Sequence, residues 1–162
     1  MDEFDEFSAV EEYQKNLHDA VTKYVQTDNP IYTAWGRRDV PFIEKLYYTN
    51  KILYYILIWT KGFGILQYCA FVYEENAGIH IIRLTSELKP IEYSYFLPFK
   101  DIKKIRIQAL FVPYSKTIIK TKSRKFIIII ADGIRYTMAD KFGNSGYLAF
   151  LEKLGDFART LK

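Results

Sequence analysis

The sequence predicts an α+β fold: a strongly bent antiparallel sheet or small barrel, capped by a C-terminal helix and preceded by an extra N-terminal helix. Short runs rich in Ile, Tyr and Phe alternate with turn residues, which is typical of antiparallel strands. Asp132-Gly133 between two such runs indicates a tight hairpin. An apolar stripe at helical spacing ends the chain and consists of Tyr147, Phe150, Leu151, Leu154, Phe157, Ala158 and Leu161.

The first 30 residues predict an acidic amphipathic helix. Ser8 and Glu11 have the spacing of a capping box, and apolar residues then recur at helical intervals as far as Tyr24. We therefore expect a helix from about Ala9 to Gln26, with loose residues before Ser8. At the other end of the chain, Asn144 or Ser145 is expected to cap the last helix.

Between these helices the sequence indicates strands of different clarity. Residues 42–48 are ambiguous, and we assign residues 52–59 to a strand rather than to a buried helix. Along residues 91–99 the odd-numbered positions form one apolar face. The other strands are expected at residues 31–36, 65–73, 79–84, 104–107, 126–130 and 134–138, with a hairpin loop at residues 74–78.

Three stretches of the sequence together resemble a known family. They are the glycine and apolar run from Gly64 to Val72, the run Leu-Pro-Phe-Lys-Asp-Ile-Lys-Lys-Ile at residues 97–105, and the helix that contains residues 150–154. This pattern is similar to that of the bacterial PH-like domains, the small prokaryotic form of the pleckstrin-homology superfold, over roughly residues 60–155. PH-like domains bind lipids, peptides or proteins, so the resemblance implies a binding module.

With that resemblance, the chain divides into two parts. Residues 1–30 are an acidic N-terminal helical segment, and residues 31–162 are a single PH-like domain. A chain of 162 residues is long enough for one domain with a core.

Residue types that most often act in catalysis or metal binding are scarce in this chain. Cys69 is the one cysteine and lies in an apolar run, so we expect a buried thiol and no Cys–His metal site. His18 and His80 are expected to be solvent-facing or structurally satisfied. Gly62-Phe63-Gly64 lacks the lysine and hydroxyl residue of a phosphate loop. We therefore expect no cofactor and no catalysis, with a small enzyme as the weakest alternative.

Targeting and membrane signals are weak. The first 12 residues are acidic, unlike a secretory signal, so we expect a soluble cytoplasmic protein. Residues 52–73 are mostly apolar, but Lys61 lies near their centre, at a cost of about 3 kcal/mol on insertion scales. Two apolar runs joined by a glycine turn explain these residues better than a membrane span.

Charge is distributed unevenly along the chain. Residues 1–30 hold eight acids against two lysines, a net charge of −6, whereas residues 100–125 hold nine bases against one acid, a net charge of +8. Alternation places Lys104 and Arg106 on one face of a strand. We expect a ligand-binding surface formed by Lys104, Arg106, Lys120, Lys122, Arg124 and Lys125.

This basic surface favours an anionic partner. We expect a protein partner or an anionic membrane surface, with a nucleic-acid-binding regulator as the alternative function. A homo-oligomer, in which the acidic helix of another copy meets the bases, is a further alternative. The competing interpretation is a solvated sheet face whose edge lysines discourage aggregation.

Overall fold

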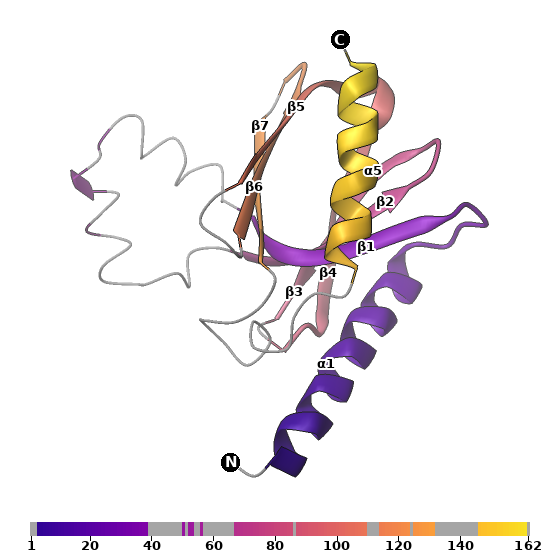
Figure 1. The fold of residues 1–162 in the computed structure, drawn as a ribbon, viewed down its shortest axis with the longest axis vertical. Helices are drawn as coiled ribbons and strands as arrows, with labels where there is room; N and C mark the ends of the chain where they lie inside the picture. Colours follow the sequence, from indigo (N-terminus) through magenta and orange to yellow (C-terminus); the bar gives the residue numbers. More distant parts are fainter. Residues whose placement is uncertain are drawn as a thin grey trace.

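Seven strands form one antiparallel sheet in the order β4-β3-β2-β1-β7-β6-β5 (Figure 1). The computed structural model describes residues 3–38, 50, 52–53, 56, 67–85, 87–109, 114–123, 125–131 and 146–161. Its elements are α1 (Glu3–Tyr24), β1 (Ile31–Arg38), β2 (Gln67–Glu74), β3 (Gly78–Leu84), β4 (Pro90–Pro98), η2 (Phe99–Asp101), β5 (Ile102–Ala109), β6 (Tyr114–Thr121), β7 (Lys125–Ala131) and α5 (Tyr147–Thr160). The α+β prediction and the C-terminal helix are confirmed.

The sheet bends at β1, which belongs to both of its parts. β1 pairs with β2 along its whole length, from Ile31↔Glu74 to Arg38↔Gln67, but it pairs with β7 only at residues 36–38. Figure 1 shows β5, β6 and β7 running across the direction of β1. Within the described residues the outer strands β4 and β5 do not pair with each other, so the structure has an open bent sheet and not a barrel.

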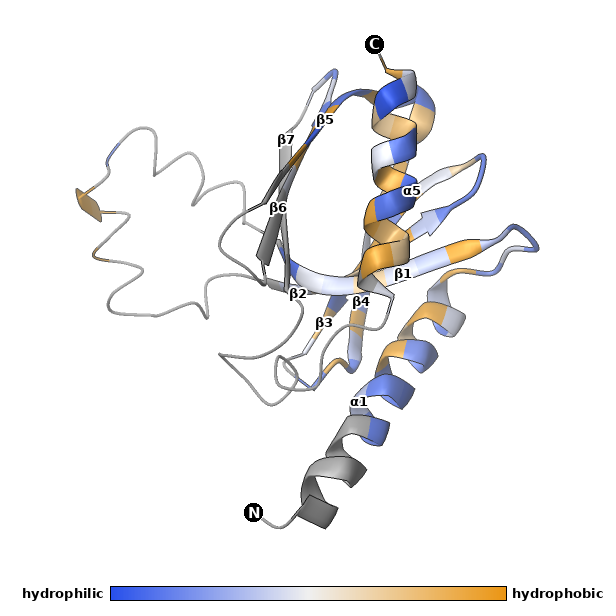
Figure 2. Ribbon diagram, in the orientation of Figure 1, coloured by the Kyte–Doolittle hydropathy of each residue, from blue (hydrophilic) through white to orange (hydrophobic). Residues whose placement is uncertain are grey.

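The two helices cover opposite faces of the sheet. In β2, Phe71 packs in the same core cluster as Phe150 and Leu154 of α5, whereas its neighbour Val72 packs with Val21 of α1. Successive residues of a strand point to opposite faces, so α1 and α5 lie on either side of β2. Apolar and hydrophilic residues interleave along α5 and along the coloured part of α1, as amphipathic packing requires (Figure 2).

Helix α1 begins earlier than the sequence suggested. The expected start near Ser8 is wrong, because the helix runs from Glu3 to Tyr24 and therefore includes residues expected to be loose. No glycine or proline interrupts residues 3–8, and acids near a helix N-terminus interact favourably with its dipole. The expected apolar face is confirmed, since Tyr13, Leu17, Val21 and Tyr24 all pack against the sheet.

The cap of α5 also differs from the prediction. Its N-cap is Gly146, without a side-chain hydrogen bond, and not Asn144 or Ser145. A Cβ atom at this position would lie 1.8 Å from the carbonyl oxygen of Thr33. Gly146 is therefore needed because it lets the start of α5 approach the backbone of β1.

Strand β4 does not have the single apolar face that simple alternation predicts. Tyr95 is the Cα partner of Ile81, but Tyr93 is the partner of Ile82, so the register shifts between them. Tyr95 packs in the core on the α5 side, whereas the ring of Tyr93 lies 6.0 Å from that of Tyr24 in α1. A β-bulge changes which face a residue occupies, and sequence periodicity alone does not reveal it.

The segment between β1 and β2 is described at four positions. Residues 52, 53 and 56 are helical, so the assignment of this segment to a strand is wrong there. The side chain of Asn50 accepts a hydrogen bond from the Leu53 amide at 3.1 Å, which is the geometry of an N-cap. The ambiguous residues 42–48, the turn at residues 62–64 and the hairpin at Asp132-Gly133 with the strand at 134–138 lie outside the described residues.

Thr117 of β6 offers a test of the core. Its side chain is fully buried, and its hydroxyl has no hydrogen-bond partner in the described part of the chain. Valine has the same shape without the hydroxyl, so Thr117→Val should raise the free energy of unfolding by about 1 kcal/mol. Urea denaturation with an unchanged m-value measures this effect. Thr27→Val is the control, because the Thr27 hydroxyl donates to Glu74 at 2.6 Å and its loss should destabilise. Equal effects of the two changes would contradict the explanation.

Candidate functional site: a basic end of the sheet

The β5–β6 hairpin separates buried from exposed side chains by alternation. In β6, Ile119 is fully buried and Lys120 is exposed. In β5, Ile105 packs against the core while Lys104 and Arg106 are exposed. One face of this hairpin therefore contributes to the core beneath α5, and the other presents charge to solvent.

Three cationic positions lie in one row across the strands. The register makes Lys104 the Cα partner of Lys120, and Lys120 the partner of Lys125. Cross-strand partners have Cβ atoms about 5 Å apart, and like charges placed opposite each other are destabilising. Chain folding therefore holds cations together at this end of the sheet in spite of their mutual repulsion.

The other predicted site residues lie close to this row, except Arg124, which is not among the residues that the structure describes. Arg106 is the partner of Ile118, one step along the hairpin from the row, and Lys122 is exposed in the turn that follows β6. Arg124 lies outside the described residues, and Lys125 is placed by its backbone alone. The structure thus brings Lys104, Arg106 and Lys120 onto one hairpin.

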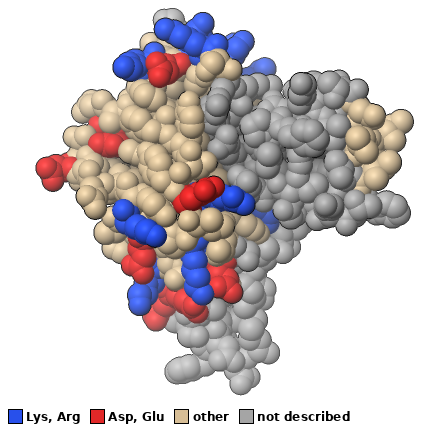
Figure 3. Space-filling view, turned by 180° about the vertical axis from the view of Figure 1, so that it is seen from behind, with Lys and Arg blue, Asp and Glu red and all other residues tan. Residues whose placement is uncertain are grey.

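Two further cations belong to this end and were not among the predicted site residues. Lys100, in η2, and Lys103, at the register shift of β5, are both exposed. We define the basic end as the described exposed residues Lys100, Lys103, Lys104, Arg106, Lys120 and Lys122. Figure 3 shows Lys and Arg gathered at the top of the molecule, where Figure 1 places the β6–β7 turn.

The cations of the basic end make no ion pair within the described residues, whereas Arg83, Lys89, Lys153 and Arg159 each contact an acid. Elsewhere, Lys153 contacts Glu75 at 2.6 Å and Lys89 contacts Glu87 at 2.8 Å. The hydrogen bond from Lys153 to Glu75 also raises the pKa of this lysine. Asp101 is the one acid within residues 100–125, and it makes no ion pair in the described structure.

A polar network around the buried Glu74, on the α1 side of the sheet, was not anticipated. His80 contacts Glu74 at 2.6 Å through Nε2 and the Tyr93 hydroxyl at 2.8 Å through Nδ1. Because a carboxylate only accepts hydrogen bonds, Nε2–H donates to Glu74, and in the neutral imidazole Nδ1 then accepts from the Tyr93 hydroxyl. Thr27 and Asn29 also donate to Glu74, at 2.6 and 2.8 Å. The network joins the segment that follows α1 to β2, β3 and β4.

The protonation states favour a structural role for this network. Burial raises the pKa of the Glu74 carboxyl, but hydrogen bonds from Thr27, His80 and Asn29 outweigh it and leave the pKa below its ordinary value. Burial, with the charge of Glu74, raises the pKa of Tyr93. A nucleophilic tyrosine would need a lowered pKa. The hairpin loop expected at residues 74–78 is the sequence feature that could have placed Glu74 near His80. The loop pairs β2 with β3, and Glu74 is the Cα partner of Gly78.

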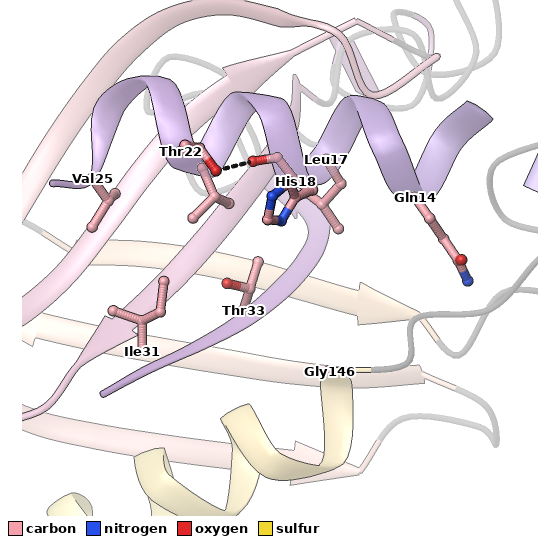
Figure 4. A pocket seen from close by; sticks show the side chains of 9 residues that line it. Gln14, Leu17, His18, Thr22, Val25, Ile31, Thr33 and Gly146 are labelled. Atoms are coloured by element: carbon pink, nitrogen blue, oxygen red, sulfur yellow. Dashed lines mark hydrogen bonds between the residues drawn. The ribbon is translucent and has the colours of Figure 1, made fainter. Parts of the chain in front are cut away.

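A pocket of about 480 Å³ lies between α1 and β1 (Figure 4). Leu17 and Val21 of α1, and Val25 directly after it, face Ile31 of β1 across the pocket, and Gly146 borders it. Polar lining comes from Gln14, His18, Thr22 and Thr33. Its size suits a small ligand, but His18 is its one titratable group among the described residues, so the pocket has no acid–base pair there.

Comparison of the chain with protein-family models, curated proteins and solved structures gives no match. Over the described ranges, no three His, Cys, Asp or Glu side chains lie together in a way that could hold a metal ion. In the same part of the chain, no helix is long and apolar enough to cross a membrane. The functional argument therefore depends on the geometry of the basic end.

Glu74→Gln tests the network through its dependence on pH. The folded-state pKa of Glu74 is lowered, so its contribution is present above the unfolded pKa of about 4.3 and is lost as pH falls through the folded pKa. The variant should lose about 1–3 kcal/mol of stability near neutral pH, and the difference from the parent should shrink below about pH 4. Chemical denaturation across this range measures it. A constant difference at every pH would contradict the assignment.

Proposed function

We propose that this chain is a non-catalytic binding module of the PH-like type, which docks an anionic partner through the basic end. The open, bent antiparallel sheet with a C-terminal helix against one face supports the PH-like interpretation. The proposal depends mainly on one observation, the opposition of Lys104 and Lys120 on neighbouring strands, with Lys125 next in register on β7. Bound anions would remove the repulsion within this row.

Protection of a sheet edge does not account for the whole basic end. β5 is an outer strand, so Lys104 and Arg106 would discourage edge-to-edge pairing. β6, however, lies between β5 and β7, and has no free edge to protect. Lys120 therefore needs another reason, and attraction of an anion supplies it.

Nucleic acid is the second candidate, and the aromatic residues argue against its single-stranded form. Single strands are usually held by rings that stack on bases between cationic contacts. Residues 100–108 and 115–125 contain no aromatic residue. The adjacent Phe99 has its ring packed 4.3 Å from that of Phe157 and 4.9 Å from that of Tyr73. Among the residues whose side chains the structure describes, the basic end thus offers charge without a stacking platform.

Charge reversal tests the proposal. A variant with Lys104→Glu, Arg106→Glu, Lys120→Glu and Lys122→Glu should lose binding to polyglutamate and to anionic vesicles by more than tenfold. Each cation near an anionic membrane contributes about 1 kcal/mol, so the loss should be large. Vesicle flotation and a salt-titrated binding assay measure it, with neutral vesicles and duplex DNA as further arms.

The matched control changes net charge equally at other sites, and carries Lys15→Glu, Lys23→Glu, Arg83→Glu and Lys89→Glu. It should keep most of the parent's binding. If the control loses as much as the basic-end variant, net charge and not the basic end is responsible. If the basic-end variant binds every polyanion as the parent does, the proposed function is wrong. Stronger binding to duplex DNA than to the other probes would favour the nucleic-acid alternative.

A further inference from the structure

The acidic and basic parts of the chain lie at opposite ends of the molecule. Figure 1 places the start of α1 at one end of the longest axis, and the β6–β7 turn at the other. Among the described side chains of α1, the first to join the core is Tyr13. The helix before Tyr13 projects past the sheet in Figure 1. A continuous helix does not fold back, so this segment does not reach the basic end of its own chain.

The projecting segment has the composition of a ligand for a basic surface. Residues 2–12 contain six acids, and no base occurs before Lys15. Asp-Glu-Phe occurs twice in succession, at residues 2–4 and 5–7, so two aromatic residues accompany the acids. Glu11 and Glu12 are exposed and form no ion pair within the described residues. The segment thus has the opposite sign to the basic end.

We propose that the basic end docks the acidic first part of α1 from a second copy of this chain, so that copies associate head to tail. This inference rests on the proposed function and names its partner. Charge complementarity favours it: residues 1–30 have a net charge of −6 and residues 100–125 a net charge of +8. Neither excess is neutralised by the other within one molecule, because they lie at its two ends (Figure 1).

The dimensions of the two surfaces are compatible. Residues 3–12 of α1 form about 15 Å of helix, at 1.5 Å per residue. The row from Lys104 through Lys120 to Lys125 crosses two strand spacings, which is about 10 Å. Ile118, partly exposed opposite Arg106, gives an aromatic residue of the segment an apolar contact. The acidic part of the helix is therefore longer than the row of cations that it covers.

Association of this kind has a distinctive stoichiometry. Each copy uses two different surfaces, so the contact is heterologous and each added copy leaves one of each surface free. Assembly then continues with concentration instead of stopping at a dimer, unless it closes into a ring. Because the contact is ionic, it should weaken as salt shortens the Debye length from about 10 Å at 0.1 M to about 3 Å at 1 M.

Two neutralised variants test the pairing of surfaces. One carries Lys104→Gln, Arg106→Gln, Lys120→Gln and Lys122→Gln. The other carries Glu3→Gln, Glu6→Gln, Glu11→Gln and Glu12→Gln. In sedimentation velocity at low salt, the parent should form species larger than a dimer, and each variant alone should be monomeric. An equimolar mixture should stop at a 1:1 dimer, since one copy supplies only acids and the other only bases.

A chain in which the acidic and basic sets of charges are exchanged is the control for folding defects. Reversal of all eight positions in one chain should restore assembly, with at least tenfold weaker association in about 1 M salt. A parent that stays monomeric at low salt but binds polyglutamate overturns the second-copy partner and leaves the proposed function standing. A parent that neither assembles nor binds polyglutamate or anionic vesicles overturns both. Assembly that persists in the two neutralised variants also overturns the inference.

Discussion

The position of every other element depends on the unequal pairing of β1. Its full length is hydrogen-bonded to β2, yet only Gly36–Arg38 at its end pairs with β7. This short junction allows β5, β6 and β7 to leave the direction of the other strands while remaining in the same sheet (Figure 1). Gly146 then brings the start of α5 against Thr33 of β1, where a side chain would collide. The bend and the helix position are thus consequences of the same strand.

The bend also divides the sheet into two unequally covered parts. Helix α1 packs against β2, β3 and β4, and α5 packs against β1, β2 and β5. β2 is therefore buried on both faces, from Cys69 to Tyr73. The β5–β6 hairpin has a core face and a charged face, on which Lys104 and Lys120 are exposed. The polar network of Glu74, which holds the segment that follows α1 near β4, helps to maintain this division.

Local patterns in the sequence predicted those elements that local physics determines. The stripe on α5, the buried Cys69 and most strands follow from periodicity and composition. The shift between Tyr93 and Tyr95 does not, because a bulge is settled by pairing with β3. The helical residues 52, 53 and 56 were missed although Asn50 is a common helix cap. Contacts between distant elements, such as Thr27 with Glu74, have no local signal at all.

The arrangement of the basic residues could likewise be predicted from the sequence only in part. Alternation correctly placed Lys104 and Arg106 together, since they share one strand face. That Lys120 stands opposite Lys104 depends on the β5–β6 register, which sequence alone left open. Two cations that are cross-strand partners repel each other, whereas two cations that are only close in sequence need not. Like charges about 5 Å apart on neighbouring strands destabilise the free protein, and in the proposed function an anion from outside the molecule relieves this repulsion.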